Sequence, residues 1–428
     1  RYDPDNRLAQ WLAPLFVLFL PVGFYTAPML GNEGLNTVLC SAALYFLLRT
    51  LQQPDWRQPA LLGLTLGLAL MTKATAAAVA AAAVITLALW TLRTRQWRLG
   101  TRSLALTLAV TALVCGWYYG RNVMHFGTPF AMSRPYLVVA HVENAFPQGQ
   151  RGFSAYLGFD PRILENPRYV EGPVINSVWT GMFAGTWFEV VGGNLMPSVL
   201  SDAGARWAGR LLIALGIVPT LMVLLGVATA IWRLIRTGWD NVLVTMLTAF
   251  GCMLALFVAF TLRVSTFTAV KPSYLMPVVV PFSFWFALGC GALARWRRLL
   301  IGVLAECGLL LAVIVPVFTY QLMFTAELTG FYFNALGGLY YFAGRTQAAR
   351  EIFTAVADGY HLYTGHENLA AVALEEGKPD EALRHLEQAA QLAPEQIFGA
   401  GEDYSRLLQL DLAEYACTTA YIQHLRGR

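Results

Sequence analysis

Charged residues are scarce in this 428-residue chain, since Asp, Glu, Lys and Arg together make up only 13% of it. A typical soluble domain carries roughly 25%. Lysine is rarer still, because Lys73, Lys271 and Lys378 are the only three lysines among 30 basic residues. The net charge of +4 is too weak to indicate a polyanionic partner. These shortages argue against a soluble enzyme, a disordered chain and a nucleic-acid-binding protein.

Paired cysteines and metal-binding spacings are also missing from the sequence. The six cysteines stand singly, with no CxxC and no zinc-like Cys–His spacing, so neither a disulfide framework nor a zinc site is suggested. A divalent cation stays open as a cofactor. The chain begins at Arg1 without a signal peptide, and we expect it to lack its true N-terminus.

Long apolar stretches are what the sequence does contain. Apolar residues make up 57% of the chain and its mean hydropathy is +0.51, so a bilayer is its natural solvent. We expect an all-α fold with nine membrane spans. Seven lie at about residues 10–30, 33–51, 103–120, 207–232, 241–262, 273–293 and 299–323, and two more lie within 60–92.

The stretch 60–92 is predicted to form two helices rather than one. At 1.5 Å per residue a single helix would measure about 50 Å, which is too long for one span. The stretch is interrupted by Thr72, Lys73 and Thr75. Two helices also keep the basic loops, such as 93–102, on alternate sides of the membrane. If basic loops face the cytoplasm, the Thr72–Thr75 tip, the segment 121–206 and everything after about residue 324 lie on the far side.

Two segments differ from the spans in composition. Segment 121–206 is too long for a connector, and its part around Trp179–Trp187 is expected to lie in the interface or in an extramembrane cap. After residue 326 the pattern becomes short amphipathic helices. The spacing of small residues in 368–394, with Gly377 at the turn and Pro394 ending the second helix, is typical of a tetratricopeptide repeat. We therefore predict a membrane domain over 1–325 and a small repeat domain over 326–428, which could serve a protein partner.

Four groups of polar residues at predicted membrane boundaries are candidate functional residues, because charges there are costly without a purpose. All four fall on the far side. They are Asn32–Glu33, Thr72–Lys73, Arg121, and the loop from Arg263 through Lys271 to Tyr274.

The two lysines of the membrane domain carry the most information. Lys73 and Lys271 both lie on the face where basic residues are disfavoured, so each needs a local reason. Snorkelling at a helix end is one reason for Lys73, and an anion site built with Thr72 and a helix N-terminus is the other. Such a site suits a phosphate.

The remaining groups leave ordinary alternatives open. Asn32 fits a helix N-cap, with Glu33 in the first turn of that helix. Arg121 follows an aromatic belt formed by Trp117, Tyr118 and Tyr119, so it is either an interfacial anchor or a second anion ligand.

The order of these motifs resembles the GT-C membrane glycosyltransferases, especially the branch of protein O-mannosyltransferases and bacterial aminoarabinose transferases. The resemblance rests on Asn32-Glu33, on Gly67–Lys73, on Trp117–Asn122 and on Lys271–Pro277, and it covers about residues 7–323. It implies an inverting hexosyltransferase that moves a sugar from a polyprenyl-phosphate donor to a protein, lipid or glycan acceptor.

The resemblance also implies roles for single residues. It places Lys73, Lys271 and Tyr274 at the donor phosphate, joined in our prediction by Thr72, Arg121 and Arg263, and it matches Glu33, with Asn32 beside it, to a catalytic acidic position. We expect the family's main catalytic carboxylate to lie upstream of Arg1. We expect an integral protein of a bacterial inner membrane with 121–206 and the tail in the periplasm.

Three other classes remain open. A polymer-ligase type of lipid-linked glycan transferase also uses basic residues on the far side. A transporter or flippase would place charges at mid-span, often in repeated halves. A membrane scaffold acting through its repeat tail would leave Lys73 and Lys271 unexplained.

Overall fold

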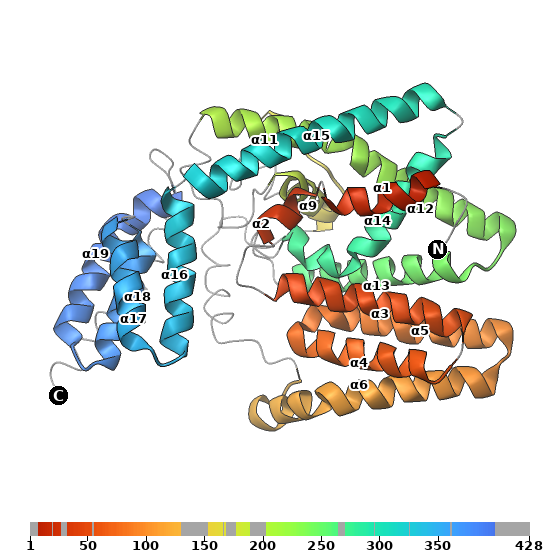
Figure 1. Cartoon of the computed structure of the whole chain (residues 1–428), viewed down its shortest axis with the longest axis horizontal. Coiled ribbons are helices and arrows are strands. Elements are labelled where there is room, and N and C mark those ends of the chain that lie inside the picture. The colour runs from red at the N-terminus through yellow and green to blue at the C-terminus, as the bar shows by residue number, and fades with distance from the viewer. Residues whose placement is uncertain are drawn as a thin grey trace.

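The computed structural model describes most of the chain as helix (Figure 1). The described residues are 7–18, 20–26, 32–53, 55–129, 153–165, 167, 177–188, 203–263, 270–294, 296–324, 326–359 and 362–398. Within these ranges all regular structure is helical, which confirms the predicted all-α class.

Four long helices run alongside one another and form the first half of the membrane domain (Figure 1). They are α3 (Glu33–Gln52), α4 (Arg57–Thr72), α5 (Ala77–Thr94) and α6 (Trp97–Phe126). Glycines let α4 approach α6 closely, since a Cβ on Gly63 would lie 2.6 Å from the Thr107 carbonyl oxygen. The Thr107 hydroxyl donates to the Pro59 carbonyl across the same contact. Small residues and hydroxyls thus bind these helices together, as is usual between helices in lipid.

A second group of helices packs against the first. It contains α1 (Arg7–Leu18), α2 (Pro21–Thr26), α11 (Ala203–Leu215), α12 (Ile217–Thr237), α13 (Asn241–Arg263), η5 (Pro272–Val278), α14 (Val279–Ala292) and α15 (Arg297–Phe324). Helices α12 and α14 cross at two glycines. A Cβ on Gly226 would lie 1.8 Å from the Trp285 carbonyl oxygen, and one on Gly289 would lie 2.0 Å from that of Met222. This crossing brings the two backbones into direct contact.

Six helices of the described part are long and apolar enough to cross a membrane. They are Glu33–Gln52, Ala74–Thr94, Trp97–Phe126, Gly209–Thr237, Asn241–Leu262 and Pro272–Ala292. Residues 60–92 are divided at Lys73 into α4 and α5, as predicted, and α4 has 16 residues. Residues 10–30 hold two shorter helices, α1 and α2, rather than one long helix. The total of nine spans therefore stays a prediction.

The segment between α6 and α12 contributes short helices to the bundle. They are η2 (Phe153–Tyr156), η3 (Pro161–Leu164) and α9 (Val178–Trp187), followed by α11. Helix α9 is packed more deeply than an amphipathic surface piece, because Val178, Thr180 and Trp187 are buried and the remaining side, with Trp179 and Phe183, is half-buried. It is part of the packed interior.

The described part of the tail, as far as Phe398, consists of two helical hairpins. They are built from α16 (Ala326–Phe342), α17 (Thr346–Thr354) with the π-helical turn η6 (Ala355–Gly359), α18 (Tyr363–Glu375) and α19 (Pro379–Phe398). Gly377 makes the turn between α18 and α19 with φ of +72°, a conformation that favours glycine. The prediction that Pro394 ends the last helix is wrong, because α19 continues to Phe398. Proline there removes only one backbone donor near a helix end. Assignment to the tetratricopeptide family stays a prediction.

Candidate functional site

Asn32 and Glu33 stand where α3 begins, close to the end of α4. Asn32 takes the N-cap position, but its side chain does not cap the helix. Its Nδ2 atom instead donates to the Thr72 carbonyl oxygen over 2.8 Å. Asn32 thus holds the predicted N-cap position, with Glu33 in the first turn, but its side chain bonds to a free carbonyl at the end of α4 rather than to its own helix.

Lys73 joins the ends of α4 and α3. Its backbone is extended, with φ of −158° and ψ of 137°, which ends α4 before the 3₁₀ turn η1 (Ala74–Ala76). Its Nζ atom lies 2.6 Å from Oε1 of Glu33, and the two side chains are 17% and 28% exposed. Lys73 therefore does not simply extend into water, as snorkelling would require.

The segment before α14 places two more residues near this ion pair. The Lys73 Nζ atom lies 5.2 Å from the centre of the Tyr274 ring, a cation–π distance. Lys271 is half-buried at the start of η5, and its charge interacts with that of Glu33. The structure thus brings together Glu33, Lys73, Lys271 and Tyr274, which come from three distant segments; we call these four the basic–acidic cluster.

The other predicted residues take different places. The Thr72 hydroxyl donates to Leu68 within its own helix, and the Thr75 hydroxyl accepts from Asn36 at 3.2 Å. Arg121 is exposed on α6, and none of the contacts described for the basic–acidic cluster involves it. Arg263 ends α13, but its side chain lies outside the described residues.

Two polar residues that the sequence did not single out support this site. Asn36 is buried one turn into α3 and donates to Thr75, while the Tyr119 hydroxyl donates to the Leu70 carbonyl over 2.8 Å. Tyr119 thus holds the last turn of α4, and Asn36 holds the turn η1 that follows it. Tyr119 lay in the predicted aromatic belt, but nothing in the pattern of the sequence indicated this bond.

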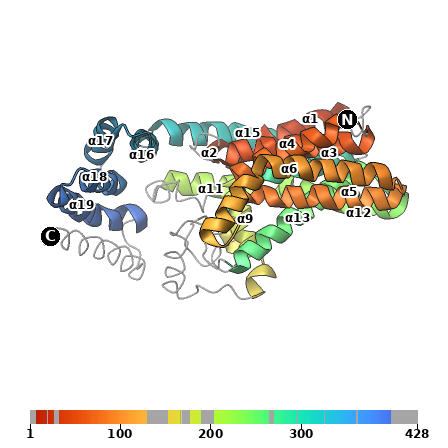
Figure 2. The same cartoon turned by 90° about the horizontal axis from the view of Figure 1, so that it is seen from below.

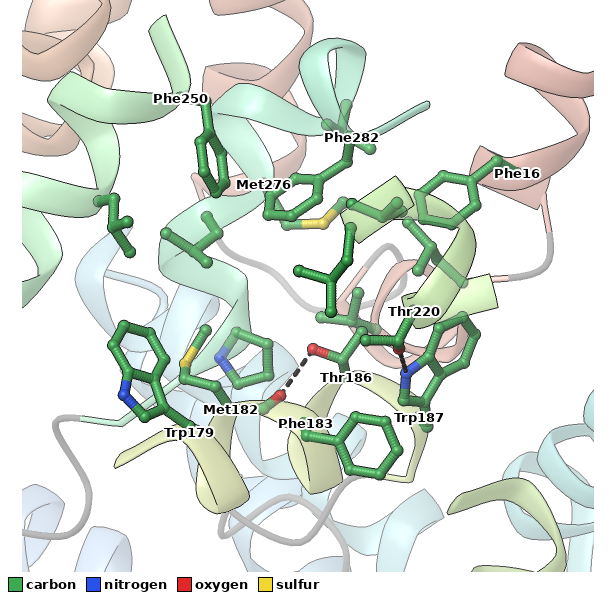
Figure 3. A pocket seen from close by; sticks show the side chains of 18 of the residues that line it. Phe16, Trp179, Met182, Phe183, Thr186, Trp187, Thr220, Phe250, Met276 and Phe282 are labelled. Atoms are coloured by element: carbon green, nitrogen blue, oxygen red, sulfur yellow. Dashed lines mark hydrogen bonds between the residues drawn. The ribbon is translucent and has the colours of Figure 1, made fainter. Parts of the chain in front are cut away.

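An apolar cavity of about 450 Å³ is lined in part by η5 (Figure 3). Pro272, Leu275 and Met276 of η5 line it, so one short helix contacts both the cavity and the basic–acidic cluster. Polar groups in its wall bond to the protein: Thr186 donates to the Met182 carbonyl and Trp187 donates to the Thr220 hydroxyl. The wall also includes Phe16, Leu20, Trp179, Phe183, Phe250 and Phe282. The sequence did not reveal this cavity, because its wall comes from six separate segments.

In the part of the chain that the structure describes, no group of three or more His, Cys, Asp or Glu side chains is placed to bind a metal ion. We therefore assign no ligands to the divalent cation that the sequence left open.

Comparison with known proteins gives one match. Residues 6–119 match the model of the family described as dolichyl-phosphate-mannose-protein mannosyltransferase. The matched stretch is less than half of the chain, but it contains Asn32, Glu33, Thr72 and Lys73. No curated protein and no solved structure matches the chain. The match supports a membrane glycosyltransferase of the GT-C type, and with the six apolar helices it supports an integral membrane protein.

Proposed function

We propose that this protein transfers a sugar from a polyprenyl-phosphate donor to an acceptor on the extracytoplasmic side of the membrane, with inversion at the anomeric carbon. The observation that carries the proposal is the basic–acidic cluster, in which Lys73 is ion-paired with Glu33 at the ends of spanning helices and Lys271 lies near the same carboxylate. The family match over residues 6–119 supports the same reaction class.

Lys73 and Lys271 are proposed to bind the donor phosphate. In the reaction an acceptor hydroxyl oxygen attacks the anomeric carbon, the bond from that carbon to the phosphate oxygen breaks, and the phosphate leaves with the electron pair. Two ammonium groups would neutralise the charge that grows on the leaving phosphate. Tyr274 would hold Lys73 in place through its ring.

Glu33 is proposed to act first as a positioning residue for Lys73. Because Glu33 and Lys73 form a direct ion pair, a donor phosphate that contacts Lys73 would take over part of the lysine's hydrogen bonding. The carboxylate of Glu33 would then be available to accept the proton of the acceptor hydroxyl. Asn32 supports this arrangement by tying the two helix ends together.

The apolar cavity is proposed to receive the first isoprene units of the donor lipid. Its wall is lined by aromatic and aliphatic side chains, and η5 places it next to the two lysines. A lipid-linked phosphate needs both environments, a cationic site for its head and an apolar site for its chain.

The proposed orientation places the basic–acidic cluster, segment 121–206 and the tail in the periplasm of a bacterium. It rests on the basic loops that alternate along the sequence. In Figure 1 the cluster's end of α3 and α4 faces the side on which the tail lies. In this orientation α1 and α2 together would form one span, and α4 and α15 would each form another, which with the six apolar helices makes nine. The two tail hairpins would act as tetratricopeptide units open to a protein partner.

The test is cleavage of the donor. The purified chain in vesicles is given a polyprenyl-phosphate sugar and a mixture of peptide, lipid and glycan acceptors, and release of polyprenyl phosphate is measured. We expect the donor to bind, binding to be lost in Lys73→Met but kept in Lys378→Met, the matched control in the tail, and release to follow the same order and to depend on acceptor. Movement of intact donor across the membrane without cleavage would indicate a flippase instead. Absence of any donor binding would contradict the proposal.

A further inference from the structure

Helix α16 links the membrane domain to the tail and has an unusual direction. Helix α15 ends at Phe324 and α16 begins at Ala326, and Figure 1 shows the two helices running in different directions. In Figure 1 α16 runs across the direction of α3–α6, and in Figures 1 and 2 it is the tail helix nearest to the bundle. A helix that crosses the spanning helices at their ends lies parallel to the membrane surface.

The inner side of α16 is fixed by contacts to the tail. Asn368 of α18 donates to Asn334 over 2.9 Å, and Tyr341 is hydrogen-bonded to Glu375 of α18. A Cβ on Gly337 would lie 2.5 Å from the Phe353 ring of α17. At about 100° per residue, positions 334, 337 and 341 share one side of the helix, which faces α17 and α18.

The outer side of α16 is apolar and exposed. Leu336, Leu339 and Phe342 are 37%, 51% and 87% exposed, and their positions lie opposite the contacts with α17 and α18. The helix has 17 residues, of which Glu327 is the charged one. Helix α17, by contrast, carries Arg350 and Glu351 within nine residues. Among the tail helices of the described residues, α16 therefore has the composition of a helix that contacts lipid.

We propose that the outer side of α16 lies in the headgroup–acyl boundary of the bilayer, with Leu336, Leu339 and Phe342 in contact with lipid. The partner is the lipid surface itself, because α16 follows α15, which carries no charged residue after Glu306, and lies across the bundle axis. An interfacial helix buries its apolar side at this depth while its polar side faces water. The contact would hold the two hairpins of the tail flat against the membrane, on the side of the basic–acidic cluster.

The experiment places a photo-reactive benzophenone amino acid at Leu339 of the full chain in vesicles of phosphatidylcholine and phosphatidylglycerol. The matched control carries it at Glu351, an exposed position of α17. After irradiation, mass spectrometry should find an adduct of one phospholipid at position 339, at least tenfold more abundant than at position 351.

Other outcomes would overturn the proposal. A cross-link from position 339 to another part of the chain, or to a second copy, would show that protein covers this side. Equal lipid labelling at 339 and 351, or none at 339, would show that α16 stands in water. If the Leu339 variant fails to fold, the same measurement at Leu336 decides between these results.

Discussion

Lys73 and Glu33 form an ion pair of 2.6 Å although 40 positions separate them in the chain. Both side chains are largely shielded from water, so each charge depends on the other for compensation. The pair fixes the end of α4 against the start of α3, where Lys271 and Tyr274 also lie. A single contact thus defines the geometry of the proposed donor site.

The first prediction concerns the strength of this pair. Glu33→Gln and Lys73→Met should each lower the unfolding temperature in detergent. The double variant should lose less stability than the sum of the losses in the two single variants. The coupling energy should fall within about 0.5–3 kcal/mol, as for charges in direct contact. Additive losses would mean that the two side chains do not interact in the folded protein.

The second prediction concerns the apolar cavity. Wild type should bind a long-chain polyprenyl phosphate at least tenfold more tightly than a short-chain one, because each buried CH₂ contributes about 0.8 kcal/mol. Thr186→Phe fills part of the cavity and should reduce this preference. Thr237→Phe is the control, since Thr237 makes the same bond to its own helix but is exposed. An unchanged preference in Thr186→Phe would place the lipid chain elsewhere.

The third prediction concerns the crossing of α12 and α14. Gly226→Ala should destabilise the protein by about 1–3 kcal/mol, because its new methyl group would overlap the Trp285 carbonyl. In Gly251→Ala the added Cβ meets no atom within 4 Å, and the change should be neutral or slightly stabilising. Thermal unfolding of both variants checks this, and equal melting temperatures would show that the helices do not cross at Gly226.

The fourth prediction is that acid weakens the tail. Hydrogen bonds from Lys378 and Arg350 lower the pKa of Glu376, the bond from Arg350 lowers that of Glu381, and burial lowers the pKa of His385. In all three cases the folded tail binds fewer protons than the unfolded tail, so its stability falls as pH falls. The contribution of His385 should be lost as pH drops below about 6.5, and those of the carboxylates below about 4.5.

Hydrogen exchange of α18 and α19 in the full chain, corrected for intrinsic rates, measures this loss. In His385→Gln the protection of these helices from exchange should change less between pH 7 and about 5.5, where the histidine titrates. Greater protection of these helices at low pH would contradict the assignment.

Much of the membrane domain follows from the sequence alone. The break at Lys73 was predicted because residues 60–92 are too long for one span and are interrupted by Thr72, Lys73 and Thr75. The alternation of basic loops placed Glu33, Lys73 and Lys271 on one face, and the structure brings these residues together. Their role in binding a donor phosphate stays a prediction.

The sequence did not predict contacts that depend on packing between distant segments. Asn32 matched a helix cap by local pattern, but its amide bonds to Thr72 because the folded chain brings a free carbonyl within reach. Helix α9 was expected in the interface or in an extramembrane cap, which stays a prediction, but the sequence did not indicate that α9 packs deeply against other elements. In each case the decisive partner comes from another element, which a linear pattern does not reveal.

The central claim is that Lys73 and Lys271 hold the phosphate of a lipid donor, and direct binding of polyprenyl phosphate tests it best. Native mass spectrometry or a quenching titration would compare wild type with Lys73→Met, Lys271→Met and the control Lys378→Met. Losing a charged hydrogen bond costs about 1.5–3 kcal/mol, so the first two variants should bind roughly 10- to 100-fold more weakly. The control should bind as wild type. Equal affinity in all four proteins would contradict the account.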